Sequence, residues 1–230
     1  MVDLTHLIAH EMRTPLTRIL TSVLLLRDYR DRMPPERQNG HFDQIEAEIR
    51  SITQFLDDIL EMARIEASGV PIRDETVDIS ELLTNLTSRN AAQYSAVRLR
   101  VVGCDYPLIG RTNFHLLDRI FGNLISNAFK YTPAEGEVSV SLTSLGERMT
   151  LTVRDTGIGI PVADHARLFE PFHRANNARG IKGTGLGLYI VKRAVVLLDG
   201  QIEIESAEGR GTTFLVSLPF QRESTQASTA

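Results

Sequence analysis

A heptad pattern of apolar residues in the first third of the chain constrains its fold more than any other feature. From Phe42 to Ala63 the apolar residues recur in alternating steps of three and four, as along the seam of a coiled coil. The same rhythm runs earlier, from Met12 to Leu26. Asp31 to Gly40, which contains Pro-Pro and Asn-Gly, separates the two stretches and is expected to break the helix. The sequence therefore predicts a long antiparallel helical hairpin over residues 1–67.

Such a hairpin cannot cover its own seam, because two helices of ~25 residues leave one apolar side open to water. Pairing two hairpins into a four-helix bundle would cover that side, so we expect a homodimer. The seam consists of Met12, Leu16, Ile19, Val23 and Leu26 in the first helix and Phe42, Ile45, Ile49, Ile52, Leu56, Ile59 and Ala63 in the second.

The rest of the chain is predicted to form a second domain of a different class. Residues 68–74 (SGVPIRD) have the Gly and Pro of a linker, and residues 75–220 alternate between helical and strand patterns. We expect helices at 79–94 and 113–131, a strand at 98–102, and four further strands, EVSVSL, MTLTVRD, QIEIES and TTFLVSLP. This order favours a two-layer α/β sandwich. The predicted fold class is therefore a multidomain protein with an all-α domain followed by an α+β domain. Residues 221–230 read as a polar tail.

Composition excludes several classes of function. The formal net charge is -4 and no run of Lys or Arg occurs, which argues against binding to nucleic acid or to anionic lipid. Cys104 is the only cysteine, so an internal disulfide and a thiolate zinc site are excluded and a reducing compartment is expected. No apolar stretch approaches the ~20 residues of a membrane-spanning helix.

The string HEMRTPL places a histidine beside an acid on the first predicted helix. If the seam residues face the core, His10 lies on the outer side, with Thr14 one turn further on the same face. A neutral imidazole attacks phosphorus through one ring nitrogen while a carboxylate, here Glu11, accepts the N–H of the other. Two plainer interpretations remain: a solvated surface histidine, or a metal clamp by His6 and His10.

Three polar residues in NLISNAFKYTP share one face of a predicted helix. Asn123, Asn127 and Lys130 lie at i, i+4 and i+7. An amide oxygen can bind Mg²⁺, and a lysine can meet phosphates as a point charge. Taken alone, the two asparagines could equally be capping or solvated residues.

Two glycine-rich blocks follow. In DTGIGIP, Asp155 ends an apolar strand, where its carboxylate could accept a hydrogen bond from the exocyclic amine of adenine. Gly157 and Gly159 let the backbone approach the base. GTGLGL opens a helix, and the N–H groups of such a turn form a phosphate site. Between them, LFEPFHRANNARGIK becomes polar and basic and is predicted to be a mobile lid that offers Arg174, Arg179 and Lys182 to the phosphates.

In order and spacing these blocks resemble the catalytic core of bacterial two-component sensor histidine kinases. HEMRTPL is similar to the family's phosphoacceptor box, NLISNAFKYTP to its asparagine box, LFEPFHR to its phenylalanine box, and DTGIGIP and GTGLGL to its glycine boxes. The resemblance implies a homodimer that uses ATP and Mg²⁺ to phosphorylate itself. It also implies a partner, a response regulator with an aspartate that receives the phosphoryl group. It also implies a cytoplasmic location, either alone or as the cytoplasmic part of an inner-membrane receptor.

The resemblance also assigns roles to individual residues. It implies His10 as phosphoacceptor, Glu11 as base, Asn127 as Mg²⁺ ligand, Asp155 as the reader of adenine, and Thr14 as the residue that orients a hydrolytic water. The rest of the nucleotide pocket would be Asn123, Lys130, Tyr131, Arg174, Gly183, Thr184, Gly185, Leu186, Gly187 and Leu188. Three alternatives stay open at this point: an ATPase like DNA gyrase or MutL, a phosphorelay scaffold without catalysis, and a serine kinase of the same superfamily.

Overall fold

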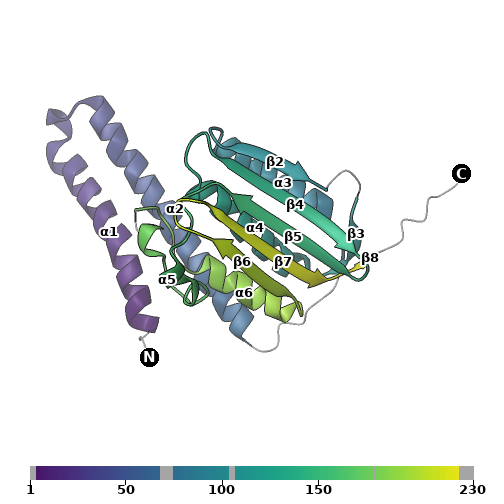
Figure 1. Ribbon diagram of the computed structural model, residues 1–230. Helices are drawn as coiled ribbons and strands as arrows, with labels where there is room; N and C mark the ends of the chain where they lie inside the picture. Colours follow the sequence, from purple (N-terminus) through teal and green to yellow (C-terminus); the bar gives the residue numbers. More distant parts are fainter. Residues whose placement is uncertain (1–3, 68–74, 104–106, 179, 223–230) are drawn as a thin grey trace, which may run out of the picture. The chain divides into compact units, whose positions relative to one another are not determined.

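The computed structural model describes residues 4–67, 75–103, 107–178 and 180–222 (Figure 1). Cys104, Arg179, the predicted linker at 68–74 and most of the predicted tail therefore lie outside the described residues. The chain divides into two compact units, Met1–Ala63 and Arg64–Ala230, and we describe each by itself.

The first unit is the predicted helical hairpin. Helix α1 spans Leu4–Tyr29, a short 3-10 turn η1 spans Arg30–Arg32, and helix α2 spans Pro35–Glu66. The break between the helices is shorter than the sequence predicts, because Pro35 occupies the first helical position, where its missing N–H and fixed φ are tolerated. Gly40 then continues the helix instead of ending it.

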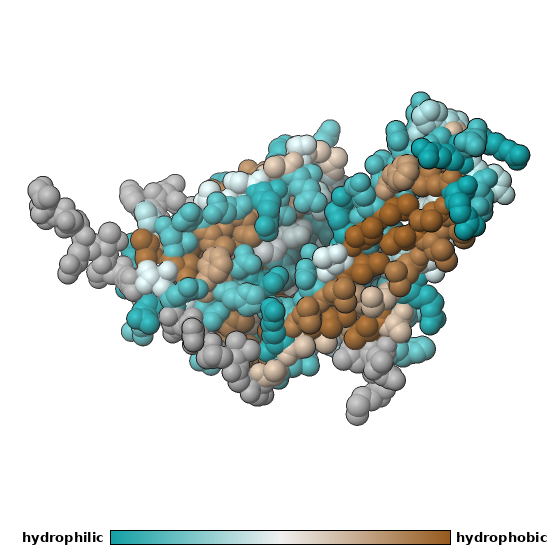
Figure 2. All heavy atoms as spheres, turned by 180° about the vertical axis from the view of Figure 1, so that it is seen from behind, coloured by the Kyte–Doolittle hydropathy of each residue, from teal (hydrophilic) through white to brown (hydrophobic). Residues whose placement is uncertain are grey.

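One side of the hairpin is covered and the other is open. In each helix alternate seam residues are half-buried against the partner helix, such as Ile19 and Ile45. The seam residues between them stay exposed: Leu16 is 51% exposed, Phe42 49% and Ile49 51%. Figure 2 shows the resulting hydrophobic band along one face of the hairpin. The prediction that a single hairpin leaves part of its seam uncovered is confirmed.

Polar contacts also join the two helices. The Ser22 hydroxyl donates to Oε1 of Gln44 at 3.2 Å and lies 3.4 Å from Nδ1 of His41. One turn earlier in α1, Nη1 of Arg18 donates to the buried Glu48 carboxylate at 3.1 Å. These pairs fix which residues of α1 and α2 lie side by side, which a uniform apolar seam does not do.

The second unit is built on a five-stranded sheet with the order β2-β4-β5-β7-β6. Its strands are β2 (Arg98–Val102), β4 (Glu137–Leu145), β5 (Arg148–Asp155), β6 (Gln201–Ser206) and β7 (Thr212–Pro219). All neighbours run antiparallel except β2 and β4, which are parallel. All five strands were predicted from sequence within a few residues of their ends.

Three helices pack on this sheet: α3 (Ile79–Gln93), α4 (Phe114–Tyr131) and α6 (Gly187–Leu197), with α4 contacting both α3 and α6 (Figure 1). Helix α4 begins where the Asn113 side chain accepts a hydrogen bond from the Leu116 N–H at 3.0 Å. Its apolar face supplies Phe121 and Phe129, both fully buried. The helices form one layer and the five-stranded sheet forms the other, with the inward side chains of the strands facing the helices. The predicted two-layer α/β architecture is confirmed.

A second, three-stranded sheet was not predicted. It has the order β1-β3-β8 and consists of β1 (Glu75–Asp78), β3 (Ile109–Thr112) and β8 (Gln221–Arg222). Because β8 pairs with β3, the domain extends two residues past Phe220, into the segment predicted to be a polar tail. The short elements α5 (Val162–His165) and η2 (Asn176–Ala178) lie between the two glycine blocks.

Candidate functional site

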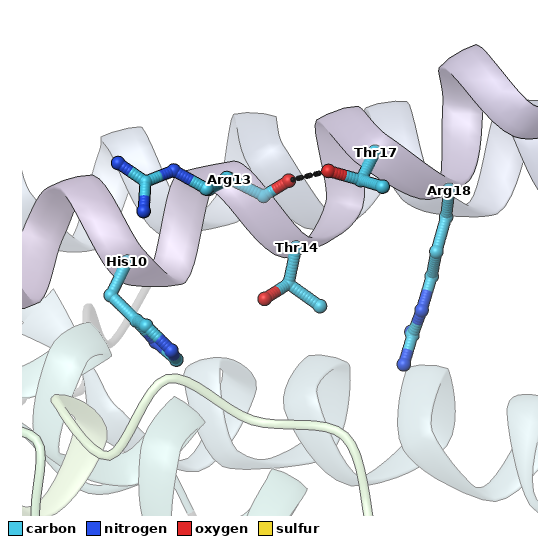
Figure 3. Close-up of a pocket in the computed structure, with 5 residues that line it drawn as sticks. All are labelled: His10, Arg13, Thr14, Thr17 and Arg18. Atoms are coloured by element: carbon cyan, nitrogen blue, oxygen red, sulfur yellow. Dashed lines mark hydrogen bonds between the residues drawn. The ribbon is translucent and has the colours of Figure 1, made fainter.

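His10 and its predicted base lie close together on α1. Nδ1 of His10 is 3.5 Å from Oε1 of Glu11, and the two side chains are 66% and 40% exposed. A proton on Nδ1 facing the carboxylate leaves the lone pair on Nε2 for nucleophilic attack. Figure 3 shows that His10, Thr14 and Arg18 point to the same side of the helix, with Arg13 and Thr17 beside them.

Thr14 differs from its neighbouring threonines. The hydroxyls of Thr17 and Thr21 donate back to the carbonyls of Arg13 and Thr17, at 2.8 and 2.9 Å. Within the described residues Thr14 makes no such bond, and α1 continues through Pro15. The Thr14 hydroxyl is therefore available to a molecule outside the helix.

Asp155 ends β5 on the inner face of the sheet, because it has the same parity as the buried residues Leu151 and Val153. Its Oδ1 accepts from the N–H of Gly157 at 2.8 Å and from the N–H of Thr212 at 3.2 Å. Burial raises the pKa of the Asp155 carboxyl above its ordinary value, and these two N–H groups lower it in part. Within the described residues both of these hydrogen bonds go to Oδ1, so Oδ2 can accept from an incoming donor.

The first glycine block forms a tight turn behind Asp155. A Cβ at Gly157 would lie 2.4 Å from the Tyr131 carbonyl oxygen, so the end of α4 packs directly on this turn. The N–H of Ile158 donates to the same carbonyl at 3.1 Å. Gly159 has φ +62, a conformation that favours glycine, and its Cβ would meet the Ala207 oxygen at 1.9 Å. The turn thus joins β5, α4 and the loop before β7.

The second glycine block lies against the polar face of α4. A Cβ at Gly187 would come within 2.7 Å of Oδ1 of Asn123, and one at Gly183 within 2.6 Å of Nζ of Lys130. Asn123 donates through Nδ2 to the Arg119 carbonyl at 2.8 Å, which orients its oxygen toward the glycines. Asn127 is half-buried on the same helix. The structure therefore brings together the asparagine helix and the glycine turn that the sequence predicted to share a pocket.

Helix α6 begins inside this turn without a side-chain cap. Leu186, which is fully buried, occupies the N-cap position, and Thr184 accepts from the Leu186 N–H at 3.2 Å. The first N–H groups of α6, starting at Gly187 and Leu188, thus have no capping side chain. Uncapped N–H groups at the start of a helix, together with its dipole, favour an anion such as a phosphate.

Tyr131 and Arg174 lie near this pocket, but Arg174 is already engaged. Nζ of Lys130 lies 4.9 Å from the centre of the Tyr131 ring. Burial raises the pKa of the Tyr131 hydroxyl, while the Arg174 guanidinium lowers it in part. Arg174 donates through Nη2 to the carbonyls of Ala178, at 2.7 Å, and Ile181. The Lys182 side chain is exposed.

Two residues at this site were missed by the sequence reasoning. Thr212 supplies the second N–H to Asp155, and Nδ2 of Asn177 donates to the Gly159 carbonyl at 2.9 Å. The antiparallel pairing of β5 with β7 sets Thr212 opposite Asp155, so a correct strand register would have revealed the first. No local pattern marks the second.

The described residues hold neither a membrane-spanning helix nor a cluster of metal ligands. None of the described helices is long and apolar enough to cross a membrane. No group of three His, Cys, Asp or Glu side chains within those residues could hold a metal ion, which leaves the His6 and His10 clamp without a further ligand of these types.

Two family models match the chain in the expected order. Residues 1–68 match the His Kinase A (phospho-acceptor) domain, and residues 112–222 match the histidine kinase-, DNA gyrase B- and HSP90-like ATPases. The order is that of a kinase core: a phosphoacceptor hairpin followed by an ATPase-type domain.

Curated relatives agree. The circadian input-output histidine kinase CikA of Synechococcus elongatus is 33% identical over 93% of this chain and 29% of its own length. The signal transduction histidine-protein kinase/phosphatase MprB of a Mycobacterium species is 34% identical over 91% of this chain and 42% of its own. The chain thus spans less than half the length of these relatives.

Solved structures agree on the fold. The histidine kinase AdeS of Acinetobacter baumannii superposes with a TM-score of 0.71 at 20% identity, over 92% of this chain and 98% of its own. Full-length ShkA in complex with AMPPNP gives a TM-score of 0.68 at 26% identity, over 94% of this chain and 45% of its own. The chain belongs to the sensor histidine kinases and has the architecture of their catalytic core.

Proposed function

We propose that this chain is an ATP-dependent protein histidine kinase that phosphorylates itself on His10 and passes the phosphoryl group to an aspartate of a response regulator. The observation that carries this proposal is the pairing of His10 with Glu11 in a chain that also holds Asp155 and an uncapped glycine turn. The kinase relatives and the phosphoacceptor match support it, and none of these comparisons favours a gyrase-like ATPase or a scaffold.

ATP is the substrate for which the pocket of the second unit is suited. Oδ2 of Asp155 would accept the exocyclic amine of adenine, because Oδ1 is held by two backbone donors. The N–H groups at the start of α6 would bind phosphate oxygens, with Lys130 and Lys182 adding charge. Asn123, Tyr131, Gly157, Gly159 and the turn from Gly183 to Leu188 would line the pocket.

Asn127 is the residue we assign to Mg²⁺. It lies on the face of α4 that carries Asn123 and Lys130, and within the described residues its side chain makes no hydrogen bond. Its amide oxygen is the hard ligand that Mg²⁺ prefers. When bound, the ion would neutralise charge on the phosphate oxygens. Most of the remaining catalysis would come from positioning the γ-phosphate in line with the attacking imidazole.

In the first transfer the lone pair on Nε2 of His10 attacks the γ-phosphorus of ATP. The N–P bond forms as the bond from the γ-phosphorus to the bridging oxygen breaks, and ADP leaves with that electron pair. Glu11 accepts the N–H of Nδ1 and so stabilises the positive charge that develops on the ring. Exposure of the imidazole lets it reach a second domain or protein.

In the second transfer the phosphoryl group moves from Nε2 to a carboxylate oxygen of the regulator, and the imidazole regains its lone pair. Thr14 lies one turn from His10 on the same side of α1, where its hydroxyl could hold a water that hydrolyses the phosphorylated regulator. The open hydrophobic band of the hairpin would be covered by a second copy of the chain, which gives a homodimer.

The test is to incubate the chain with γ-labelled ATP and Mg²⁺ and compare two matched histidine variants. His10→Gln is expected to lose the label and keep ATP affinity, because the nucleotide pocket belongs to the other unit. His6→Gln, an exposed histidine one turn upstream, is expected to label like the parent. Full labelling of His10→Gln would refute the assignment.

A further inference from the structure

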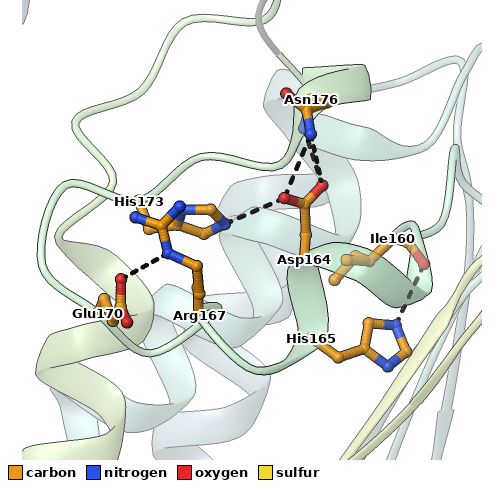
Figure 4. A network of polar contacts seen from close by, with 7 residues as sticks. All are labelled: Ile160, Asp164, His165, Arg167, Glu170, His173 and Asn176. Carbon is orange, nitrogen blue, oxygen red and sulfur yellow. Dashed lines mark hydrogen bonds and ion pairs between the residues drawn. The ribbon is translucent and has the colours of Figure 1, made fainter.

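Between the two glycine blocks, a buried carboxylate joins α5 to a later segment, residues 172–177. Asp164 is only 5% exposed. Its Oδ2 accepts from the Asn176 N–H at 3.0 Å, and both of its oxygens lie 3.4 Å from Nδ2 of Asn176. Nε2 of His173 lies 3.3 Å from Oδ1, with its side chain 9% exposed (Figure 4).

Such a carboxylate is stable only while its donors stay in place. Burying an ionised group without partners is strongly unfavourable, whereas several hydrogen bonds and a facing imidazole offset that cost. The hydrogen bonds to Asp164 come from Asn176, and the His173 imidazole faces the same carboxylate without a hydrogen bond to it. Moving this segment away from α5 would leave the charge of Asp164 without donors, so Asp164 holds the segment in one position.

The segment that Asp164 holds contacts both glycine blocks. Asn177, directly after the bonded Asn176, donates to the Gly159 carbonyl at 2.9 Å in the first block. Phe172, directly before His173, donates through its N–H to the Gly185 carbonyl at 3.0 Å in the second. A Cβ at Gly185 would lie 2.9 Å from the His173 oxygen, so the contact with the second block is close.

We propose that Asp164, acting through His173 and Asn176, is a positioning residue that holds the two glycine turns in register for the phosphates of the nucleotide. The proposal rests on the assignment of ATP to this pocket. Asp164 itself touches no part of the nucleotide. Its effect reaches the phosphate-binding turn and not the adenine-reading Asp155, which is fixed separately by Gly157 and Thr212.

The experiment measures the affinities of the whole chain for ATP and for adenosine by calorimetry. Asp164→Ala is expected to weaken ATP binding about tenfold, the loss typical of a hydrogen bond to a charged group, and to leave adenosine binding within about twofold. Glu170→Ala is the matched control, because it removes the exposed pair of Arg167 and Glu170 from the same segment and is expected to change neither affinity.

A second pair of variants acts from the other side of the contact and decides the question even if Asp164→Ala does not fold. His173→Gln keeps a polar side chain facing the Asp164 carboxylate and is expected to bind ATP like the parent. His173→Leu places an apolar side chain against the buried carboxylate and is expected to show the same selective loss of ATP affinity as Asp164→Ala.

Three outcomes would overturn the proposal. They are unchanged ATP affinity in Asp164→Ala, equal losses of ATP and adenosine affinity, and equal behaviour of His173→Gln and His173→Leu. An Asp155→Asn variant measured alongside separates this failure from failure of the proposed function. If it loses adenosine binding, the pocket stands whatever Asp164 does; if it binds adenosine like the parent, the pocket assignment itself fails.

Discussion

Asp155→Asn tests the reading of adenine with little change of shape. The amide oxygen can still accept from Gly157 and Thr212, but an N–H₂ group replaces the acceptor Oδ2. The variant loses the hydrogen bond that adenine donates to a charged acceptor, which contributes about 1.5–3 kcal/mol. Affinity for ATP, ADP and adenosine is therefore expected to fall about 10- to 100-fold, since each factor of ten corresponds to about 1.4 kcal/mol.

The same variant has a distinct effect on stability. Burial raises the pKa of Asp155 above its ordinary value of 3.8, so the folded chain holds this proton more tightly than the unfolded chain. The resulting stabilisation is fully present below pH 3.8 and is lost as the pH rises through the folded-state pKa. At pH ~7 the ionised carboxylate thus destabilises the fold, and Asn removes that penalty.

Calorimetry of binding and thermal unfolding of the same samples check both effects. We expect Asp155→Asn to bind adenosine weakly. At pH ~7 the variant should nevertheless unfold at a temperature equal to or above that of the parent, and any gain in unfolding temperature should shrink toward pH ~4. Normal adenosine affinity would refute the role of Asp155 in binding. A lower unfolding temperature at neutral pH would refute the stability argument.

Three further predictions concern the hairpin. Thr14→Ala is expected to lose phosphatase activity on a phosphorylated regulator and keep autophosphorylation, whereas Thr17→Ala, whose hydroxyl bonds within the helix, should keep both; equal phosphatase rates in the two variants would contradict the role of Thr14. Ile49→Glu, at a seam position 51% exposed in the single chain, is expected to convert a dimer to a monomer in sedimentation, and an intact dimer would place the interface elsewhere. Gly40→Ala lies inside α2 with nothing within 4 Å of the added Cβ, so it should raise the free energy of unfolding by ~0.5–1 kcal/mol in denaturant titration; a decrease would show that this residue needs glycine.

The elements predicted correctly from sequence are those whose pattern is local and long. The heptad seam from Phe42 to Ala63, the amphipathic α4 and the alternating strands β4, β5 and β7 each repeat their signal over several turns or residue pairs. The inward position of Asp155 follows from the same alternation, because Asp155 lies two residues after the buried Val153 in β5.

The parts that sequence reasoning missed depend on distant contacts. Strand β3 (Ile109–Thr112) has four residues with a glycine among them, and β8 has only two, so neither shows a periodic pattern. Pairing across more than a hundred residues creates that sheet. The contact of Asp164 with His173 and Asn176 is similar, since a four-residue helix and a 3-10 turn must fold back on each other before it exists. The end of the helical break was misplaced because Pro35 starts a helix as readily as it ends one.

The chemical stability of the phosphorylated product tests the kinase assignment most directly. A phosphoryl group on an imidazole nitrogen is a phosphoramidate, which hydrolyses in acid and survives in base, whereas a serine or threonine ester does the opposite. After incubation with γ-labelled ATP and Mg²⁺, the label on this chain is expected to be lost in acid, retained in base, and carried by the peptide that contains His10. Acid-stable label, or base-stable label on a peptide without His10, would contradict the account.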